Sequence, residues 1–189
     1  MMHLFYATYD GHTRQIAERM AQQLAAHGIK MTPKDLAAEW ISPLDLPAFE
    51  PVILLAALRY GHHLPEADKF LTDFRNARLN NPLIVLSVNL VARRPGKKTA
   101  KGNPYLRKWL RRRKVTPVFA AAIAGRLDYP RYDWLDRQLI RLIMLITRGP
   151  TDLHAIVEFT DWKQVDEIAE KIAALNKSHT KAVSPRGYN

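Results

Sequence analysis

The chain has 189 residues, and 47% of them are hydrophobic, which is enough to bury a core in one domain and argues against global disorder. It contains no cysteine, which excludes disulfides, thiolate metal sites and a cysteine nucleophile. Its net charge is +11, from 29 Lys and Arg residues against 18 Asp and Glu residues, and this excess predicts an anionic partner.

The first part of the chain predicts two strands with a helix between them. The apolar run Leu4–Thr8 predicts a strand, and residues 29–33 predict a short second one. Between these strands, apolar side chains at every fourth position predict a helix that ends at Gly28: Ile16, Met20 and Leu24. The order strand, helix, strand is the first unit of an alternating fold.

The rest of the chain continues this alternation. Three continuous apolar runs have the pattern of strands buried on both faces of a parallel sheet: Val52–Leu58, Leu83–Val88 and Val118–Ala124. Amphipathic patterns predict helices in three places: beginning at Pro65, over Trp134–Thr147, and after an N-cap at Asp161. We therefore predict an α/β fold, a doubly wound five-stranded parallel sheet with helices on both faces. One domain is expected over residues 1–176, followed by a frayed polar tail over residues 177–189.

Neither a signal peptide nor a membrane-spanning helix is expected. The N-terminal residues carry no charged region before their apolar run. The longest apolar stretch, at 139–146, is interrupted by Arg141 and is far shorter than the roughly 20 residues that span a bilayer. The expectation is a cytoplasmic protein, either soluble or peripheral to a membrane.

The loop after the first strand has the composition of a phosphate-binding turn. In a parallel sheet, ligands bind at the carboxyl ends of the strands, where this loop lies. Thr8 and Thr13 offer hydroxyl donors, and Gly11 lets the backbone approach an anion at a helix N-terminus. The glycine motifs of ATP and dinucleotide sites are absent, so the loop suits a phosphate monoester held by neutral donors. An ordinary strand–helix turn is the alternative.

The loop after the Val52–Leu58 strand is a second candidate for ligand contact. Tyr60, beside Arg59 and Gly61, has the size and position to stack on a flat ring, and a surface tyrosine is the alternative. His62 and His63 are weak candidates for acid–base catalysis. Adjacent loop histidines are more often solvated, and no cluster of ligating residues supports a metal site.

A basic segment, residues 93–114, carries eleven basic residues and no acidic one. The remaining 18 basic residues match the 18 acidic ones, so this segment accounts for the whole net charge. Its second half, from Asn103, predicts a helix with an apolar stripe of Tyr105, Leu106, Trp109 and Leu110. Such a composition is typical of a helix lying in an anionic membrane surface. The alternatives are a solvated loop whose aromatic side chains pack on the protein body, and a nucleic-acid-binding surface.

Five segments, in the same order, resemble the bacterial quinone-dependent protoporphyrinogen dehydrogenases, a family of flavodoxin-like FMN enzymes of haem biosynthesis. The first segment is similar to the phosphate loop of flavodoxin-like proteins, and the others narrow the family. The segments are Ala7–Arg14, Leu58–His62, Ser87–Arg93, Ala124–Tyr132 and Thr160–Trp162.

The resemblance implies a flavodoxin-like domain with the basic segment inserted after the fourth strand, and FMN as its cofactor. It implies oxidation of protoporphyrinogen IX to protoporphyrin IX, with loss of six electrons to a membrane quinone such as menaquinone. A flavodoxin-type electron carrier and an NAD(P)H–quinone reductase are the alternatives, and nucleic acid is not an expected partner. The protein is expected to be peripheral at the cytoplasmic face of the inner membrane, attached through Tyr105–Lys114. Quinone type, homo-oligomer formation and a membrane contact of residues 135–147 are left open.

The resemblance also assigns residues to roles. FMN contacts are implied for three loops and part of a fourth: Thr8, Tyr9, Asp10, Gly11, His12, Thr13, Leu58, Arg59, Tyr60, Gly61, Ser87, Val88, Asn89, Leu90, Gly125 and Tyr129. Contacts with the substrate carboxylates are expected from basic residues beyond them: Arg93, Arg94, Lys97, Lys98 and Arg131.

Overall fold

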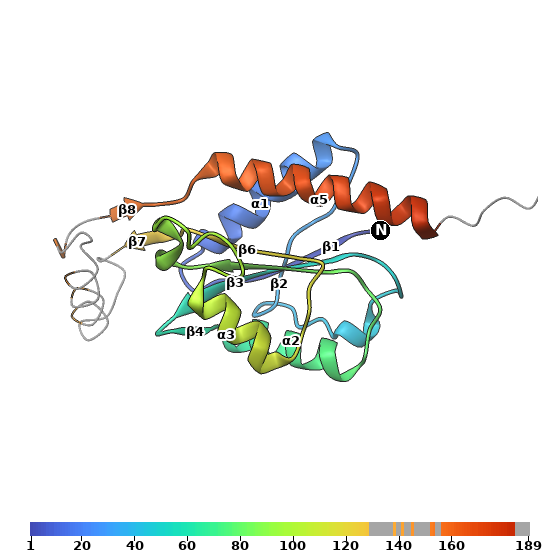
Figure 1. Cartoon of the computed structure of the whole chain (residues 1–189), viewed down its shortest axis with the longest axis horizontal. Coiled ribbons are helices and arrows are strands. Elements are labelled where there is room, and N and C mark those ends of the chain that lie inside the picture. Colours follow the sequence, from blue (N-terminus) through green and yellow to red (C-terminus); the bar gives the residue numbers. More distant parts are fainter. Residues whose placement is uncertain (129–137, 139–140, 142–144, 146–151, 154–155, 184–189) are drawn as a thin grey trace, which may run out of the picture.

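The computed structural model describes residues 1–128, 138, 141, 145, 152–153 and 156–183. Five parallel strands form the main sheet in the order β2-β1-β3-β5-β6 (Figure 1). Their bounds are β1 His3–Ala7, β2 Lys34–Asp35, β3 Val52–Arg59, β5 Leu83–Val88 and β6 Phe119–Ile123. The order reverses between β1 and β3, so a crevice is expected at their carboxyl ends.

Helices cover both faces of the sheet, as predicted (Figure 1). Helices α1 (His12–Ala26) and α5 (Trp162–Val183) lie together on one face, and α2 (Pro65–Asn76) and α3 (Pro104–Arg113) lie on the other. Two cores result, because the sheet is apolar on both sides. One contains Ile16 and Met20 of α1 with Ile172 of α5, and the other contains Phe70 of α2 with Leu106 of α3.

Two small antiparallel pairs extend this frame. Strand β4 (His62–His63) pairs with the end of β3, and β7 (Arg126–Asp128) pairs with β8 (Ile156–Glu158). Short 3-10 helices lie at Pro43–Asp45 and Leu90–Arg93. Both strand pairs begin at the carboxyl end of a main strand, so they build up the edge where a ligand would bind.

The second strand lies later than the sequence predicted. We expected it over residues 29–33, whereas β2 is Lys34–Asp35, paired with Phe5 and Tyr6 of β1. Helix α1 ends at Ala26 with His27 as its C-cap. Gly28 then has a φ of 80°, so that the Ile29 N–H bonds back to Leu24 O at 3.0 Å. Ile29 and Met31 then pack against the core below the end of α1. Their apolar side chains are therefore partly buried without forming part of a strand.

The C-terminal helix is longer than predicted. The polar composition after Asn176 predicted a frayed tail from residue 177, but α5 continues to Val183. His179, in this extension, donates from Nε2 to Phe49 O at 3.1 Å. The helix predicted over residues 134–147 falls largely outside the described residues, as do Tyr129 and Arg131. None of the described helices is long and apolar enough to cross a membrane.

The basic segment forms the connection from β5 to β6. Its first half runs beside the outer edge of β6, where Lys98 O accepts from Ala122 N at 2.8 Å and Thr99 bridges Ala121. Its second half is α3, with Asn103 as N-cap: Asn103 Oδ1 accepts from Leu106 N at 3.1 Å. The helix predicted from Asn103 is therefore confirmed.

Candidate functional site

The loop between β1 and α1 is closed by two side chains of its own. Thr8 Oγ1 accepts from Gly11 N at 3.0 Å, and Asp10 Oδ1 accepts from His12 N at 3.0 Å. Gly11 is the N-cap of α1 with a φ of 83°, a conformation that glycine adopts without strain. Within the described part of the chain, no acceptor faces the N–H groups of Thr13 and Arg14, which begin the helix. The loop is thus preformed around two open backbone donors.

His12 belongs to this loop, but its side chain bonds away from it. Thr160 Oγ1 donates to Ala124 O at 2.9 Å, so at its 2.6 Å contact with His12 Nε2 the histidine nitrogen is the donor. Burial lowers the pKa of His12, which keeps the ring neutral. The His12 ring therefore joins α1 to the end of β6, while its backbone N–H is already bonded to Asp10 Oδ1. The sequence assigned no role to Thr160.

The second candidate loop, which the sequence predicted over residues 59–63, is a tight hairpin. Leu58 pairs with His63 and Arg59 pairs with His62, so only Tyr60 and Gly61 form the turn. Both turn residues have positive φ angles, 51° and 76°, as a two-residue hairpin that follows strand twist requires. The Tyr60 ring is 51% exposed at the tip of this hairpin.

The two histidines of the hairpin have opposite environments. His62 is exposed, as predicted, but His63 is only 7% exposed, so its prediction as a solvated loop residue is wrong. His63 Nε2 lies 2.7 Å from Ser87 Oγ of β5, and its ring stacks on Trp109 of α3. Strand alternation turns His63 toward the protein body because β4 pairs with β3.

The carboxyl end of β5 carries a buried polar chain. Asn89 Nδ2 donates to Ser87 Oγ at 2.9 Å, and Asn89 Oδ1 accepts from Ala92 N and from Asn103 Nδ2, each at 3.1 Å. Of the predicted FMN residues here, Ser87, Val88 and Asn89 are buried, and only Leu90 is half-buried. The Asn103–Pro104 pair marks a helix start in the sequence, but nothing in the sequence indicates the contact with Asn89.

A cleft of about 470 Å³ joins the first two loops. On one side it is bounded by Thr8 and Tyr9, and on the other by the hairpin and the start of α2: Arg59, Tyr60, His62, His63, Leu64, Pro65 and Glu66. The Arg59 guanidinium carbon lies 3.3 Å from the centre of the Tyr9 ring. The structure therefore brings together predicted residues that are about fifty positions apart in sequence. Gly125 lies beyond β6, where an added Cβ would be 3.3 Å from Val88.

The basic residues expected to meet substrate carboxylates are partly engaged within the protein. Arg93 Nη1 donates to Leu90 O at 2.9 Å, its guanidinium lies 5.5 Å from the Phe159 ring centre, and burial lowers its pKa. Lys98 Nζ donates to Asp161 Oδ2 at 2.7 Å. Arg94 is exposed and Lys97 is half-buried, while Arg131 lies outside the described residues.

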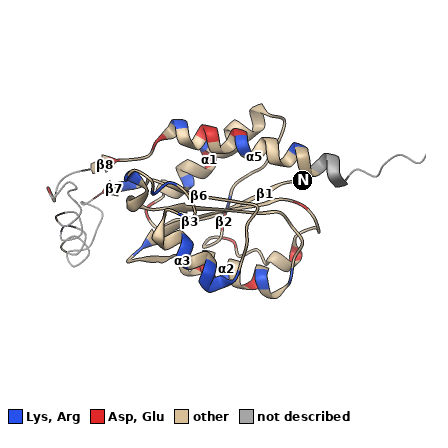
Figure 2. Cartoon of the chain, viewed as in Figure 1, with Lys and Arg blue, Asp and Glu red and all other residues tan. Residues whose placement is uncertain are grey.

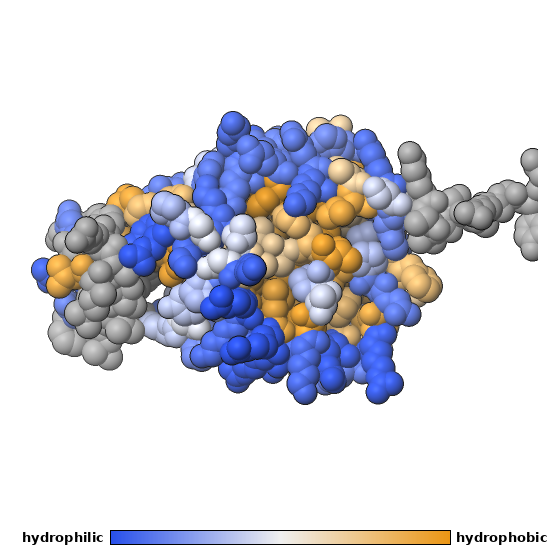
Figure 3. Space-filling model, in the orientation of Figure 1, coloured by the Kyte–Doolittle hydropathy of each residue, from blue (hydrophilic) through white to orange (hydrophobic). Residues whose placement is uncertain are grey.

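The apolar stripe of α3 faces the protein, which corrects the prediction that it lies in a membrane surface. Leu106 is fully buried and Trp109 is 6% exposed, both within the core that α2 covers. Trp109 Nε1 donates to Asp68 Oδ1 of α2 at 2.8 Å, and Arg113 forms an ion pair with the same carboxylate. A cationic surface of α3 points outward (Figures 2 and 3): Arg107, Lys108, Arg111, Arg112 and Lys114.

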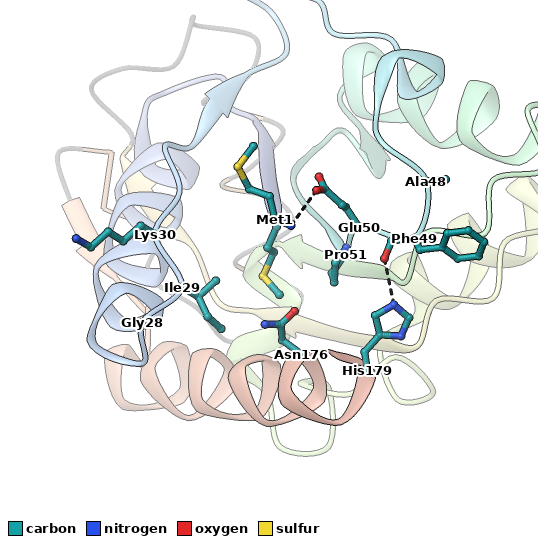
Figure 4. A pocket seen from close by; sticks show the side chains of 11 residues that line it. Met1, Gly28, Ile29, Lys30, Ala48, Phe49, Glu50, Pro51, Asn176 and His179 are labelled. Atoms are coloured by element: carbon teal, nitrogen blue, oxygen red, sulfur yellow. Dashed lines mark hydrogen bonds and ion pairs between the residues drawn. The ribbon is translucent and has the colours of Figure 1, made fainter. Parts of the chain in front are cut away.

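A larger hollow, of about 770 Å³, lies at the opposite end of the sheet (Figure 4). It is lined by residues that precede β1 and β3, by residues that follow α1 and by the end of α5, and none of these is a predicted site residue. Glu50 there accepts from the Met1 amine at 2.9 Å and contacts His3 Nε2 at 2.6 Å. These contacts lower the pKa of Glu50 and tie the N-terminus to the sheet.

The fold and the loops at its carboxyl edge are those of a flavodoxin-class protein. The family described as flavodoxin domain matches residues 3–154. Among solved structures, Flavodoxin 2 from Bacillus cereus is similar with a TM-score of 0.51 and 17% identity, over 94% of this chain and 99% of that one. The rubredoxin oxygen:oxidoreductase of Desulfovibrio gigas is similar with a TM-score of 0.57 and 17% identity, over 95% of this chain and 36% of that one. The chain thus spans about a third of the latter protein, and both likenesses concern the fold.

Relatives found by sequence identify a narrower family than the solved structures do. The protoporphyrinogen IX dehydrogenase [quinone] of Escherichia coli K12 is 37% identical over 94% of this chain and 97% of that protein. The protein of the same name in Leishmania major is 36% identical over 91% of this chain and 74% of that protein. The chain belongs to the flavodoxin domain family and, within it, to the family of the quinone-dependent protoporphyrinogen IX dehydrogenases, which are oxidoreductases.

Proposed function

We propose that the chain binds FMN at the carboxyl ends of β1 and β3. The residues present fit this group, because α1 begins with two backbone N–H groups that lack an acceptor in the described ranges and are flanked by Thr8 and Thr13. Loop Thr8–Thr13 would hold the phosphate monoester with neutral donors. The exposed Tyr60 ring and the half-buried Leu90 would contact the flat ring system.

We infer that the reaction is the oxidation of protoporphyrinogen IX to protoporphyrin IX, with a quinone as electron acceptor, in haem biosynthesis. The observation that carries this proposal is the open helix start beside an exposed tyrosine hairpin, in a chain 37% identical to an enzyme of that name. When bound, FMN supplies a two-electron acceptor, so six electrons leave the substrate in three pairs. The chain's own residues contribute binding and orientation: backbone donors at α1 for phosphate, and exposed Arg94 for a substrate carboxylate.

We further propose that the cationic surface of α3 contacts the anionic face of the cytoplasmic membrane, which places the cleft near a menaquinone acceptor. The five cations that form this surface are exposed, and each contributes on the order of 1 kcal/mol near an anionic leaflet. Because Leu106 and Trp109 are buried, this contact would rest on charge and would weaken as salt increases.

The test is a stepwise assay of the purified chain. FMN should bind with one site per chain, and protoporphyrin should then form from protoporphyrinogen IX only when menaquinone is added. FMN binding without quinone-dependent porphyrin formation would exclude the reaction. Rapid reduction of the bound flavin by NAD(P)H alone would instead identify an NAD(P)H–quinone reductase.

A further inference from the structure

His63 is held between two elements that are far apart in sequence. On one side its Nε2 lies 2.7 Å from Ser87 Oγ, at the end of β5. On the other side its ring stacks on Trp109 of α3, with 3.8 Å between ring centres and 15° between ring planes. A residue of the β3–β4 hairpin is thus fixed by the sheet and by the basic segment together.

The hydrogen bonds around Ser87 define the direction of the contact with His63. Ala92 N donates to Asn89 Oδ1, so the Asn89 amide must present its Nδ2 to Ser87 Oγ. Ser87 has a single hydroxyl hydrogen, and within the described ranges His63 Nε2 is the acceptor within reach of it. His63 therefore accepts at Nε2 and carries its proton on Nδ1.

The other side of the histidine is equally constrained. Trp109 Nε1 donates to Asp68 Oδ1 at 2.8 Å, and the Asp68–Arg113 ion pair fixes that carboxylate. The Trp109 ring therefore has one orientation, and so does the His63 ring that stacks on it. Burial lowers the pKa of His63 to about 3, so near neutral pH the ring remains a neutral acceptor for Ser87.

The strained part of the hairpin depends on this fixed position. Tyr60 has a φ of 51°, a conformation that strains a non-glycine residue, and the hairpin is closed by two residue pairs and by the bond from Leu64 N to Ala57 O at 3.2 Å. One of those pairs is Leu58 with His63. Anchoring His63 to Ser87 and Trp109 therefore fixes the end of the hairpin opposite the Tyr60–Gly61 turn.

We propose that His63 is a positioning residue, which holds the Tyr60–Gly61 turn in the conformation that receives the flavin ring and thereby sets the affinity for FMN. This inference rests on the proposed FMN site. It gives His63 a role that differs from acid–base catalysis, because a ring bonded at Nε2 to Ser87 does not exchange a proton with substrate through that atom.

The experiment separates the two contacts of His63. His63→Phe keeps a ring to stack on Trp109 but removes the acceptor for Ser87, whereas His63→Gln retains an acceptor near the position of Nε2. The FMN dissociation constant, measured by flavin fluorescence quenching on folded protein, should rise about tenfold in His63→Phe and much less in His63→Gln. Ser87→Ala removes the same hydrogen bond from its other end. The double variant, His63→Phe with Ser87→Ala, should therefore bind FMN with a dissociation constant no higher than that of the weaker-binding single variant.

His27→Phe is the matched control, because His27 is an exposed residue at the far end of α1 and should leave FMN affinity unchanged. Hydrogen exchange of the Tyr60 and Gly61 amides should accelerate in His63→Phe and not in His27→Phe. Equal FMN affinity in wild type, His63→Phe and Ser87→Ala, with only the free energy of unfolding reduced, would make His63 a structural residue and overturn the proposal. Absence of FMN binding by the wild-type chain would instead refute the proposed function, and this inference with it.

Discussion

Lys98 and Asp161 join the basic segment to the residue that precedes α5, with Lys98 Nζ donating to Asp161 Oδ2 at 2.7 Å. The same carboxylate caps α5, because Asp161 Oδ1 accepts from Gln164 N at 3.2 Å. The bond from Lys98, followed by that from Gln164, lowers the pKa of Asp161 below its usual 3.8. The Asp161 side chain thus caps α5 and also holds the basic segment, which runs beside the outer edge of β6.

Replacing Asp161 should separate these two roles. Asp161→Ala removes the cap and should lower the free energy of unfolding by about 1 kcal/mol at pH 7. Asp161→Asn keeps a capping oxygen and should cost less. A carboxylate with a lowered folded-state pKa contributes its full stability above its ordinary pKa of 3.8 and loses it as the pH falls through the lower folded-state pKa. The difference in the free energy of unfolding between wild type and Asp161→Asn should therefore shrink as the pH falls below 3.8. Urea unfolding at pH 7 and pH 3 measures both effects, and a difference that persists unchanged at pH 3 would contradict them.

His63 should make stability depend on pH in a different range. Its folded-state pKa is about 3 against 6.5 in the unfolded chain, so the unfolded chain binds the proton first and stability falls as the pH drops below 6.5. From pH 7 to pH 5 this single group should remove roughly 2 kcal/mol from the free energy of unfolding. His63→Phe should lose correspondingly less over the same range in urea unfolding. Parallel pH profiles for wild type and His63→Phe would show that His63 is accessible to protons in the folded state.

The sequence predicts well what depends on local pattern. The strand Leu83–Val88 is confirmed residue for residue, and helices α2 and α3 begin at Pro65 and Pro104, as predicted. Predictions failed where contacts between residues far apart in the sequence determine which side chains are buried and where a helix ends. The burial of His63 needs Trp109, a residue far along the chain, and α5 extends through polar residues that nothing local marks as helical. The sequence predicted that α3 carries both cations and an apolar stripe. Whether that stripe packs on the protein or on a membrane depends on where α2 and the sheet lie.

Leu106 should behave as a core residue. Leu106→Ala removes a fully buried side chain between α3 and the sheet, and should lower the free energy of unfolding by about 3 kcal/mol. Leu44→Ala is the control, since Leu44 is 68% exposed and its loss should change stability by less than about 0.5 kcal/mol. Urea unfolding in the absence of lipid measures both. A small effect of Leu106→Ala would mean that α3 is not packed against the sheet in solution.

The cationic surface of α3 should determine binding to anionic vesicles. Reversing three exposed charges, Lys108→Glu, Arg111→Glu and Arg112→Glu, should release the protein from vesicles rich in phosphatidylglycerol, because attraction becomes repulsion. Arg113 is left intact, because it pairs with Asp68. The matched control reverses three exposed lysines on the opposite side of the sheet, Lys30, Lys163 and Lys177, and should retain vesicle binding. Vesicle sedimentation at two salt concentrations measures the binding. Equal release of both triple variants would mean that the net charge of the protein, rather than the cationic surface of α3, determines vesicle binding.

Gly11 and Gly28 offer a matched pair for testing the phosphate loop. They lie at opposite ends of α1 with nearly equal φ angles, 83° and 80°, and an added Cβ would meet no atom within 4 Å at either position. Alanine at either site should therefore lower the free energy of unfolding by roughly 1–2 kcal/mol, through backbone strain alone. Only Gly11→Ala should also weaken FMN binding, because relief of its strain moves the Gly11 and His12 amides that Thr8 and Asp10 hold at the start of the helix. Urea unfolding and FMN titration of both variants provide the comparison. Equal loss of FMN affinity in the two variants would mean that general destabilisation, rather than loop geometry, limits binding.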